Sequence, residues 1–264
     1  MRLPVALTIA GSDSGGGAGI QADLKTFAAL GCHGTSAITA ITAQNTEGVS
    51  RYVPVPADMI EEQISQVAVD LSPRAAKTGM LASPEIIETV AEAVRSFELG
   101  QLVVDPVMVA KGGHRLLEDE AIDGLRTLLL PLAAVLTPNL PEAEVLLGRQ
   151  IQTREEREAA ARDLAALGPG AVVVKGGHAE GDAEDAFYDG RRLRWLPGER
   201  FPTPHTHGSG CTFSAAIAAG LARGLDLGDA VDEAKAFISG AIAHALEIGY
   251  GRGPVNPMWR LGPG

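Results

Sequence analysis

The stretch from His207 to Thr212 reads His-Gly-Ser-Gly-Cys-Thr and combines small residues with an ionisable thiol. It follows a proline-rich turn and opens an alanine-rich apolar run, which is typical of a loop that leads into a helix. Free N–H groups and the helix dipole bind an anion there, most often phosphate, and the pKa of Cys211 is expected to fall. An anion site that contains a candidate base predicts phosphoryl transfer. An ordinary glycine turn with a buried cysteine is the alternative.

A second glycine-rich loop covers residues 11–19 and separates an apolar run from a helical pattern. Gly17, Gly19 and Ala22 satisfy a loose G-x-G-x-x-A dinucleotide pattern, but the signal is weak in a loop so rich in glycine. The Walker pattern G-x-x-x-x-G-K-[ST] does not occur in the chain. We therefore expect the loop before Cys211 to bind phosphates and residues 11–19 to bind a small organic substrate. A tight turn without a ligand is the alternative for residues 11–19.

Four polar residues come at or just after the ends of predicted strands. Asp105 and Glu142 could hold Mg²⁺ directly or through water, and Asn139 precedes Glu142 at the start of a helix. Lys175 could contact a phosphate as a point charge. The alternatives are an N-cap for Asn139, interaction of Glu142 with the helix dipole, and a surface position for Lys175. Lys111, directly before two flexible glycines, is a weaker candidate for a lid over phosphates.

The remaining reactive residue types indicate no other chemistry. Cys32 and Cys211 are the two cysteines, which makes a disulfide framework or a zinc site improbable and favours a reducing cytoplasm. Cys32 is interpreted as a packed small residue. His205 and His207 are interpreted as turn residues rather than ligands, and the nucleophile-elbow pattern G-x-S-x-G does not occur.

Composition excludes two classes of partner. The 264 residues carry a net charge of −11 without any run of Lys or Arg, which argues against nucleic acid and anionic membranes as partners. No apolar run approaches the roughly 18 residues that span a bilayer. A bound anion must therefore be held locally, by backbone dipoles, a few cations and a metal ion.

Short β-type runs alternate with amphipathic helical stretches along the chain. Strands are predicted at residues 5–10, 35–43, 75–78, 102–105, 134–137 and 171–175, and a hairpin at 186–188 and 191–195 around Asp189-Gly190. Helices are predicted at 20–30, 58–69, 85–97, 121–130, 142–147, 155–167, 213–223 and 230–248. This order predicts one α/β domain over residues 1–264, with a mostly parallel central sheet between two helical layers. Ligands of such sheets lie at the carboxyl ends of the strands, where the polar candidates fall.

Seven segments, in order along nearly the whole chain, together resemble one family. They are residues 10–26 (AGSDSGGGAGIQADLKT), 43–46 (AQNT), 77–81 (KTGML), 104–108 (VDPVM), 137–143 (TPNLPEA), 174–178 (VKGGH) and 206–212 (THGSGCT). The chain thus resembles the hydroxymethylpyrimidine/phosphomethylpyrimidine kinases of thiamine biosynthesis, which have the ribokinase-like fold. The resemblance implies two successive transfers from ATP, first to hydroxymethylpyrimidine and then to its monophosphate. It also implies Mg²⁺ as a cofactor and a homodimer.

The resemblance further implies roles for particular residues. Cys211 would accept the proton of the substrate hydroxyl, where the wider fold more often has Asp. Gln44 would hydrogen-bond the aminopyrimidine edge. The same pocket would be lined by Ala18, Asp23, Met80 and Val107. The transferring phosphoryl group would meet the N–H groups of Gly208, Ser209, Gly210 and Cys211. Asp105 and Glu142 would support Mg²⁺, and Lys175 and Asn139 would bind ATP.

The sequence departs from the family pattern at His205, where relatives usually have Asn, and at Ser209, where Thr is common. Two other functions remain open. One is a pyridoxal-type kinase on the same scaffold, although the stretch Val107 to His114 contains no cysteine that could capture an aldehyde. The other is a vitamer-binding protein without activity, against which the set Cys211, Asp105, Glu142 and Lys175 argues.

Overall fold

The computed structural model describes residues 3–108, 119–177 and 183–261, whose strands form a single nine-stranded sheet. The strand order is β3-β2-β1-β4-β5-β6-β7-β8-β9, and the pairs from β2 to β7 are parallel. The strands are β1 (Val5–Ser12), β2 (His33–Gln44), β3 (Val49–Pro54), β4 (Ala75–Thr78), β5 (Gln101–Val104), β6 (Val135–Leu136), β7 (Val172–Val174), β8 (Asp185–Tyr188) and β9 (Leu193–Leu196). The antiparallel strands β3, β8 and β9 close the two edges.

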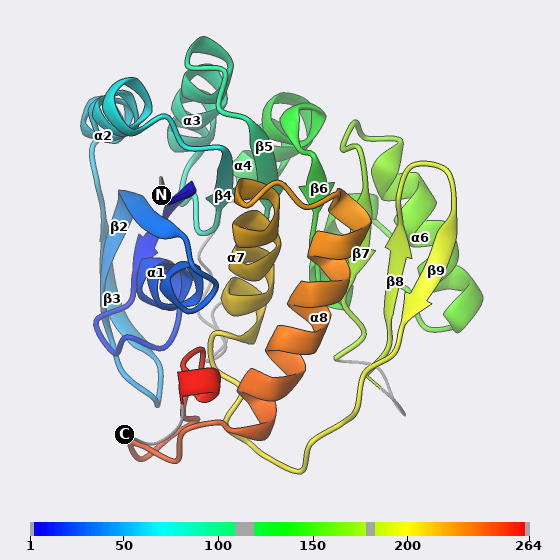
Figure 1. Ribbon diagram of the computed structural model, residues 1–264. Helices are drawn as coiled ribbons and strands as arrows, with labels where there is room; N and C mark the ends of the chain where they lie inside the picture. The colour runs from blue at the N-terminus through cyan, green and yellow to red at the C-terminus, as the bar shows by residue number, and fades with distance from the viewer. Residues whose placement is uncertain (1–2, 109–118, 178–182, 262–264) are drawn as a thin grey trace.

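Helices cover both faces of the sheet (Figure 1). One face carries α1 (Gly19–Ala29), α7 (Ser209–Ala222) and α8 (Leu227–Ala243). The other carries α2 (Ala57–Leu71), α3 (Pro84–Ser96), α4 (Asp119–Gly124), α5 (Leu140–Leu147) and α6 (Arg154–Ala165). Successive residues of a strand point to opposite faces of the sheet and belong to different hydrophobic cores. Ala6, for example, packs toward α1 and α7, whereas Leu7 packs toward α2 and α3. The predicted three-layer α/β/α fold with a mostly parallel sheet is confirmed.

The chain reverses its direction of travel across the sheet at β1. From β1 it passes through α1 to β2, and later returns through α2 to β4 on the other side of β1. The carboxyl ends of β1 and β4 therefore border a topological switch point, which is where open α/β sheets bind ligands. Helix α7 contacts β1, β4 and β5, so its N-terminus lies close to this point.

Three elements differ from the sequence predictions. Strand β3 was not predicted, because it is an edge strand whose residues are largely exposed and lack an apolar face. The helix expected over 121–130 is instead α4, a π-helical turn at Leu125–Leu129 and a 3₁₀ turn at Leu130–Leu132 that contains Pro131. Helix α8 ends at Ala243 rather than 248. The hairpin around Asp189-Gly190 is confirmed, with Gly190 at φ +86°.

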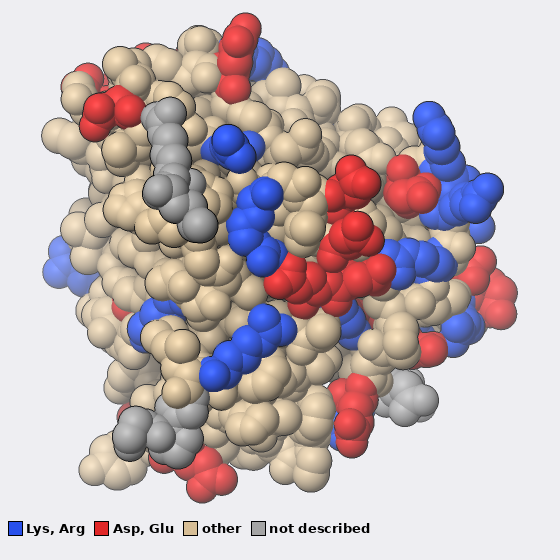
Figure 2. All heavy atoms as spheres, viewed as in Figure 1, with Lys and Arg blue, Asp and Glu red and all other residues tan. Residues whose placement is uncertain are grey.

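Within the described residues, no helix has both the length and the apolar composition that a membrane span requires. Charged side chains of both signs are interspersed on the face formed by α1, α7 and α8, and acidic residues gather over α8 beside basic ones (Figure 2). Two ion pairs on this face join Arg194 to Asp232 and Arg223 to Glu233. Lys111 and the rest of the expected lid lie outside the described residues, as does His178.

Candidate active site

A cavity of about 500 Å³ lies at the carboxyl ends of β1, β4 and β5 and reaches the N-terminus of α7. Among the described residues, those that were predicted to bind substrate, ATP or Mg²⁺ or to take part in the transfer line this cavity, with the exception of Asp23. Those lining residues are Ala18, Gln44, Met80, Asp105, Val107, Asn139, Glu142, Lys175, Gly208, Ser209, Gly210 and Cys211. The switch point of the sheet therefore brings together segments that are up to about two hundred residues apart in the sequence.

The prediction that Asp23 lines the pocket is wrong. Its side chain points from α1 into the core, is fully buried, and accepts hydrogen bonds from Lys77 Nζ at 2.8 Å and from Thr8 Oγ1 at 2.6 Å. Burial raises the pKa of Asp23, although Lys77 and Thr8 oppose the rise. The pocket position of Asp23 was implied by the family resemblance, and the helical spacing of residues 20–30 does not show that its side chain faces a buried lysine.

Lys77 lines the cavity in place of Asp23, and the sequence analysis gave it no role. Its side chain is fully buried at the end of β4. Burial disfavours the ammonium ion, but the Asp23 carboxylate outweighs this and keeps the pKa of Lys77 above its ordinary value. The signal that could have identified it is a lysine near the end of a short strand that was predicted to be buried. Lysine is almost never fully buried unless it is paired, so such a lysine indicates a buried acidic partner.

The loop that precedes α7 has the geometry of an anion site. Gly208 is the N-cap at φ +75°, and a Cβ there would lie only 1.8 Å from Gly17 O, so a side chain cannot be accommodated. The first backbone bond of this turn runs from Thr212 N to Gly208 O. The N–H groups of Gly210 and Cys211 come before it and have no partner within the helix. This loop therefore presents N–H donors at the positive end of the α7 dipole.

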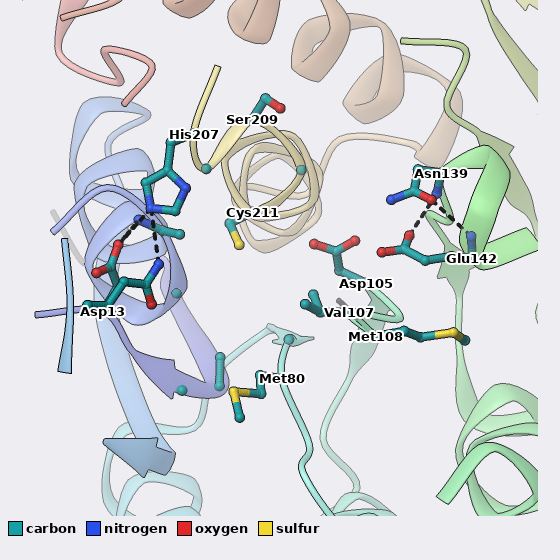
Figure 3. Close-up of a pocket in the computed structure, with 18 of the residues that line it drawn as sticks. Asp13, Met80, Asp105, Val107, Met108, Asn139, Glu142, His207, Ser209 and Cys211 are labelled. Atoms are coloured by element: carbon teal, nitrogen blue, oxygen red, sulfur yellow. Dashed lines mark hydrogen bonds and ion pairs between the residues drawn. The ribbon is translucent and has the colours of Figure 1, made fainter. Parts of the chain in front are cut away.

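Cys211 lies between the two ends of the cavity, with its sulfur directed into it (Figure 3). The expected fall in its pKa is wrong. Burial raises the pKa of Cys211 to about 11, with Lys77 opposing the rise and Asp23 and Asp105 adding to it. Two nearby carboxylates and burial thus outweigh the helix dipole, and the group is a neutral thiol at pH 7.

One end of the cavity holds the carboxylates of Asp105 and Glu142 (Figure 3), and Lys175 also lines the cavity. Lys175 Nζ lies 3.0 Å from Asp105 Oδ1, and Ser214 Oγ donates to Asp105 Oδ2 at 3.3 Å. Asn139 and Glu142 form a capping box, in which each side chain accepts from the other residue's N–H at 2.9 and 2.8 Å. The predicted N-cap and first-turn positions are confirmed, and both residues also line the cavity.

Burial raises the pKa of Glu142 to about 7, with Lys175 lowering it and Asp105 adding to the rise. The described residues contain no cluster of three or more His, Cys, Asp or Glu side chains that could hold a metal ion by themselves. Two buried carboxylates with hard oxygen atoms nevertheless fit Mg²⁺, because this ion keeps several waters and is commonly held by one or two carboxylates together with substrate phosphates.

The opposite end of the cavity contains Asp13 and His207 (Figure 3), neither of which was predicted as a site residue. The Asp13 carboxylate accepts from the N–H groups of Gly15, Gly17 and Ala18 at 2.8–3.0 Å and thereby fixes the shape of the glycine loop. His207 Nε2 lies 2.9 Å from Asp13 Oδ2, so the interpretation of His207 as a turn residue is incomplete. Its position directly before the anion loop was the available signal.

Comparison with known proteins agrees with this geometry. The family model described as phosphomethylpyrimidine kinase matches residues 13–256. A hydroxymethylpyrimidine/phosphomethylpyrimidine kinase from Rhizobium meliloti is 52% identical over 97% of both chains. The crystal structure of a phosphomethylpyrimidine kinase from Clostridium difficile is 44% identical, with a TM-score of 0.82 over 91% of this chain and 100% of that chain. A Bacillus subtilis pyridoxal kinase in complex with ADP is 41% identical, with a TM-score of 0.93 over 99% and 100% of the two chains. These matches show that the chain belongs to the phosphomethylpyrimidine kinase family.

Proposed function

We propose that the protein transfers a phosphoryl group from ATP to 4-amino-5-hydroxymethyl-2-methylpyrimidine and then to the resulting monophosphate, in thiamine biosynthesis. One observation carries this proposal: the anion loop of α7 lies between an apolar, amide-lined end of the cavity and an end with Lys175, Asp105 and Glu142. An acceptor alcohol at the first end and nucleotide phosphates at the second would meet at Cys211.

The end that contains Gln44 suits a flat ring with hydrogen-bonding edges. Met80 and Val107 supply apolar surface, and Ala18 follows the glycine loop. A side-chain amide presents a donor beside an acceptor, which pairs with an amino group next to a ring nitrogen. An aminopyrimidine has such an edge, so Gln44 would orient the ring and direct its hydroxymethyl group toward Cys211.

The transfer step needs charge stabilisation and alignment more than a strong base, because the transition state of phosphoryl transfer is loose. The neutral Cys211 thiol would orient the attacking hydroxyl, and the hydroxyl proton would pass to an oxygen of the transferred phosphoryl group late in the step. The N–H groups of Gly210 and Cys211 would stabilise the charge on the transferring phosphoryl oxygens. Lys175 would bind the phosphates of ATP as a point charge, next to Asn139 at the start of α5.

Asp105 and Glu142 would hold Mg²⁺, consistent with the hard oxygen atoms that they contribute to the cavity. When bound, the ion neutralises negative charge on the nucleotide phosphates. This local positive charge matters because the chain as a whole carries a net charge of −11 and would repel ATP at long range.

The surface supports a homodimer. Ile41 of β2 and Val53 of β3 are paired across the edge of the sheet, and 59% and 49% of their respective surfaces are exposed. An apolar pair at an exposed sheet edge is best covered by a second copy of the chain. Analytical ultracentrifugation of the native protein and of Ile41→Lys tests this. The two free cysteines fit a reducing compartment, and we propose the cytoplasm.

The activity is tested by a coupled ATP-consumption assay with Mg²⁺ and three acceptors: hydroxymethylpyrimidine, its monophosphate and pyridoxal. We expect turnover of both pyrimidines at a kcat/KM well above that of pyridoxal. Cys211→Ala should lower kcat about 10²-fold or more, as the loss of a positioning group does, while the KM for the pyrimidine stays within about threefold. Turnover of pyridoxal alone would assign the protein to vitamin B6 phosphorylation, and no turnover of any acceptor would support a binding protein.

A further inference from the structure

His207 lies where three segments of the chain meet. It directly precedes the anion loop, its side chain contacts the glycine loop, and its backbone pairs with residues 253–255. His207 N donates to Gly253 O at 3.2 Å, and Val255 N donates to His207 O at 3.0 Å. A Cβ on Gly17 would lie 2.5 Å from His207 Cδ2, so the imidazole fills the space beside that glycine. These contacts fix the ring within the wall of the cavity.

His207 Nε2 carries a hydrogen. This atom lies 2.9 Å from Asp13 Oδ2, which also accepts from Gly17 N and Ala18 N. Burial disfavours ionisation of Asp13, but the hydrogen bond and charge of His207, together with the backbone N–H groups, keep its pKa below the ordinary value. An ionised carboxylate only accepts hydrogen bonds, and His207 Nε2 is therefore a donor.

The same donor determines the orientation of the Gln44 amide. The structure places the amide nitrogen of Gln44 3.3 Å from His207 Nε2 and the amide oxygen 3.2 Å from Thr42 Oγ1. Oxygen and nitrogen exchange these positions when the amide turns by 180°, so hydrogen-bond partners decide between the two states. Thr42 Oγ1 donates its hydrogen to Ser12 O at 2.9 Å and can only accept from the amide. With the nitrogen toward His207, two N–H donors face each other. With the oxygen toward His207, that oxygen shares the Nε2 hydrogen with Asp13, and the amide nitrogen donates to Thr42 Oγ1.

We infer that His207 is a positioning residue that fixes the direction of the Gln44 amide and thereby selects an aminopyrimidine ring. This inference rests on the proposed function. After binding His207 and Thr42, the amide of Gln44 keeps one oxygen lone pair and one N–H. These match an amino group beside a ring nitrogen, the pairing by which glutamine recognises adenine. Pyridoxal has no amino group on its ring. A fixed amide also fixes which way the ring lies, and so where its hydroxymethyl group points.

The test compares His207→Phe, which removes the donor, with His207→Gln, which keeps a terminal N–H. We expect His207→Phe to raise the KM for hydroxymethylpyrimidine about 10- to 50-fold, within the range for one bidentate contact, with kcat and the KM for ATP changed less than about threefold. His207→Gln should recover most of this loss. In a Gln44→Ala background, His207→Phe should add less than about a twofold rise in KM, because the two residues act as one unit.

Additive effects of His207→Phe and Gln44→Ala would overturn the inference, as would an equal rise in KM for the aminopyrimidine and for pyridoxal. If His207→Phe does not fold, Thr42→Val tests the same orientation from the opposite side of the amide and should raise the pyrimidine KM several-fold. Calorimetric binding of the aminopyrimidine to the wild type and to each variant separates this inference from the proposed function. Absence of wild-type turnover contradicts the proposed function, whereas selective loss of pyrimidine binding in His207→Phe still supports the role of His207.

Discussion

Lys77 Nζ lies 2.8 Å from Asp23 Oδ2, and neither side chain exposes any surface to solvent. The pair joins the end of β4 to α1 directly beneath the cavity. Removing one member of a buried pair leaves an uncompensated charge, which typically destabilises a protein by about 3–5 kcal/mol. A structural role of this kind can be separated from a catalytic one by unfolding measurements.

We expect Lys77→Met to lower the free energy of unfolding by about 3–5 kcal/mol in urea titrations, because it strands the Asp23 carboxylate in the core. The double variant Lys77→Met/Asp23→Asn should recover much of that loss. Arg149→Met is the matched control: Arg149 pairs with Asp163 at 2.6 Å on the surface, and its loss should change stability by less than about 1 kcal/mol. Equal losses in the free energy of unfolding for Lys77→Met and Arg149→Met would contradict the expectation.

The raised pKa of Cys211 predicts a slow reaction with alkylating agents at neutral pH, because only the thiolate reacts. The rate of modification of Cys211 by iodoacetamide should increase steadily with pH up to about 11. Mass spectrometry of the Cys211 peptide in a Cys32→Ser background measures this directly. A rate that levels off below pH 8 would show a reactive thiolate and restore Cys211 as a general base.

Lys175 and Lys235 form similar ion pairs in different places. Lys175 lies 3.0 Å from Asp105 within the cavity, whereas Lys235 lies 2.7 Å from Asp185 and does not line the cavity. We expect Lys175→Met to raise the KM for ATP at least 10-fold, since a cation is removed from the proposed phosphate site. Lys235→Met should leave that KM within about twofold, whatever its effect on stability. Similar kinetic effects of the two substitutions would argue against a role for Lys175 in binding ATP.

Glu142 predicts a pH-dependent stability in the protein without nucleotide or Mg²⁺. Its pKa is raised from an ordinary 4.5 to about 7 in the folded state. The folded state therefore binds the Glu142 proton more tightly than the unfolded state does. The resulting contribution to the free energy of unfolding is fully present below pH 4.5 and is lost as the pH rises through 7. Relative to the wild type, Glu142→Gln should gain on the order of 2 kcal/mol between pH 5 and pH 8. Stability is measured by thermal or urea denaturation at each pH. The same pH dependence in the wild type and in Glu142→Gln would contradict this expectation.

The sequence was sufficient to predict the layers of the fold and most of the cavity wall. Buried strands such as Val172–Val174 are short apolar runs, and the switch-point rule then places the loops that follow them together. The errors concern the direction of one side chain and the electrostatic environment of another. The resemblance placed Asp23 in the pocket wall, and the sequence could not show that its side chain points toward Lys77. Nor could it show that burial and two carboxylates would outweigh the helix dipole at Cys211.

The contact between Asp13 and His207 could not be predicted from the sequence. They are 194 positions apart in the sequence, and each has an adequate local explanation, as a loop acid and as a turn residue. Their contact depends on the packing of the glycine loop against the anion loop, where Gly17 and Gly208 allow close approach of the two backbones. Strand β3 was missed for a related reason, since an exposed edge strand has little apolar pattern of its own.

The pairing of residues 253–255 with His207 also has a consequence for biosynthesis. Arg252 N donates to Thr46 O at 2.8 Å, and Gly253 N donates to His205 Nδ1 at 2.9 Å, so this late segment ties together loops made much earlier. On the ribosome, the strands of the sheet emerge long before residues 251–255. A nascent chain can therefore assemble its sheet before the cavity wall is complete, because this part of the wall forms only after residues 251–255 have been made.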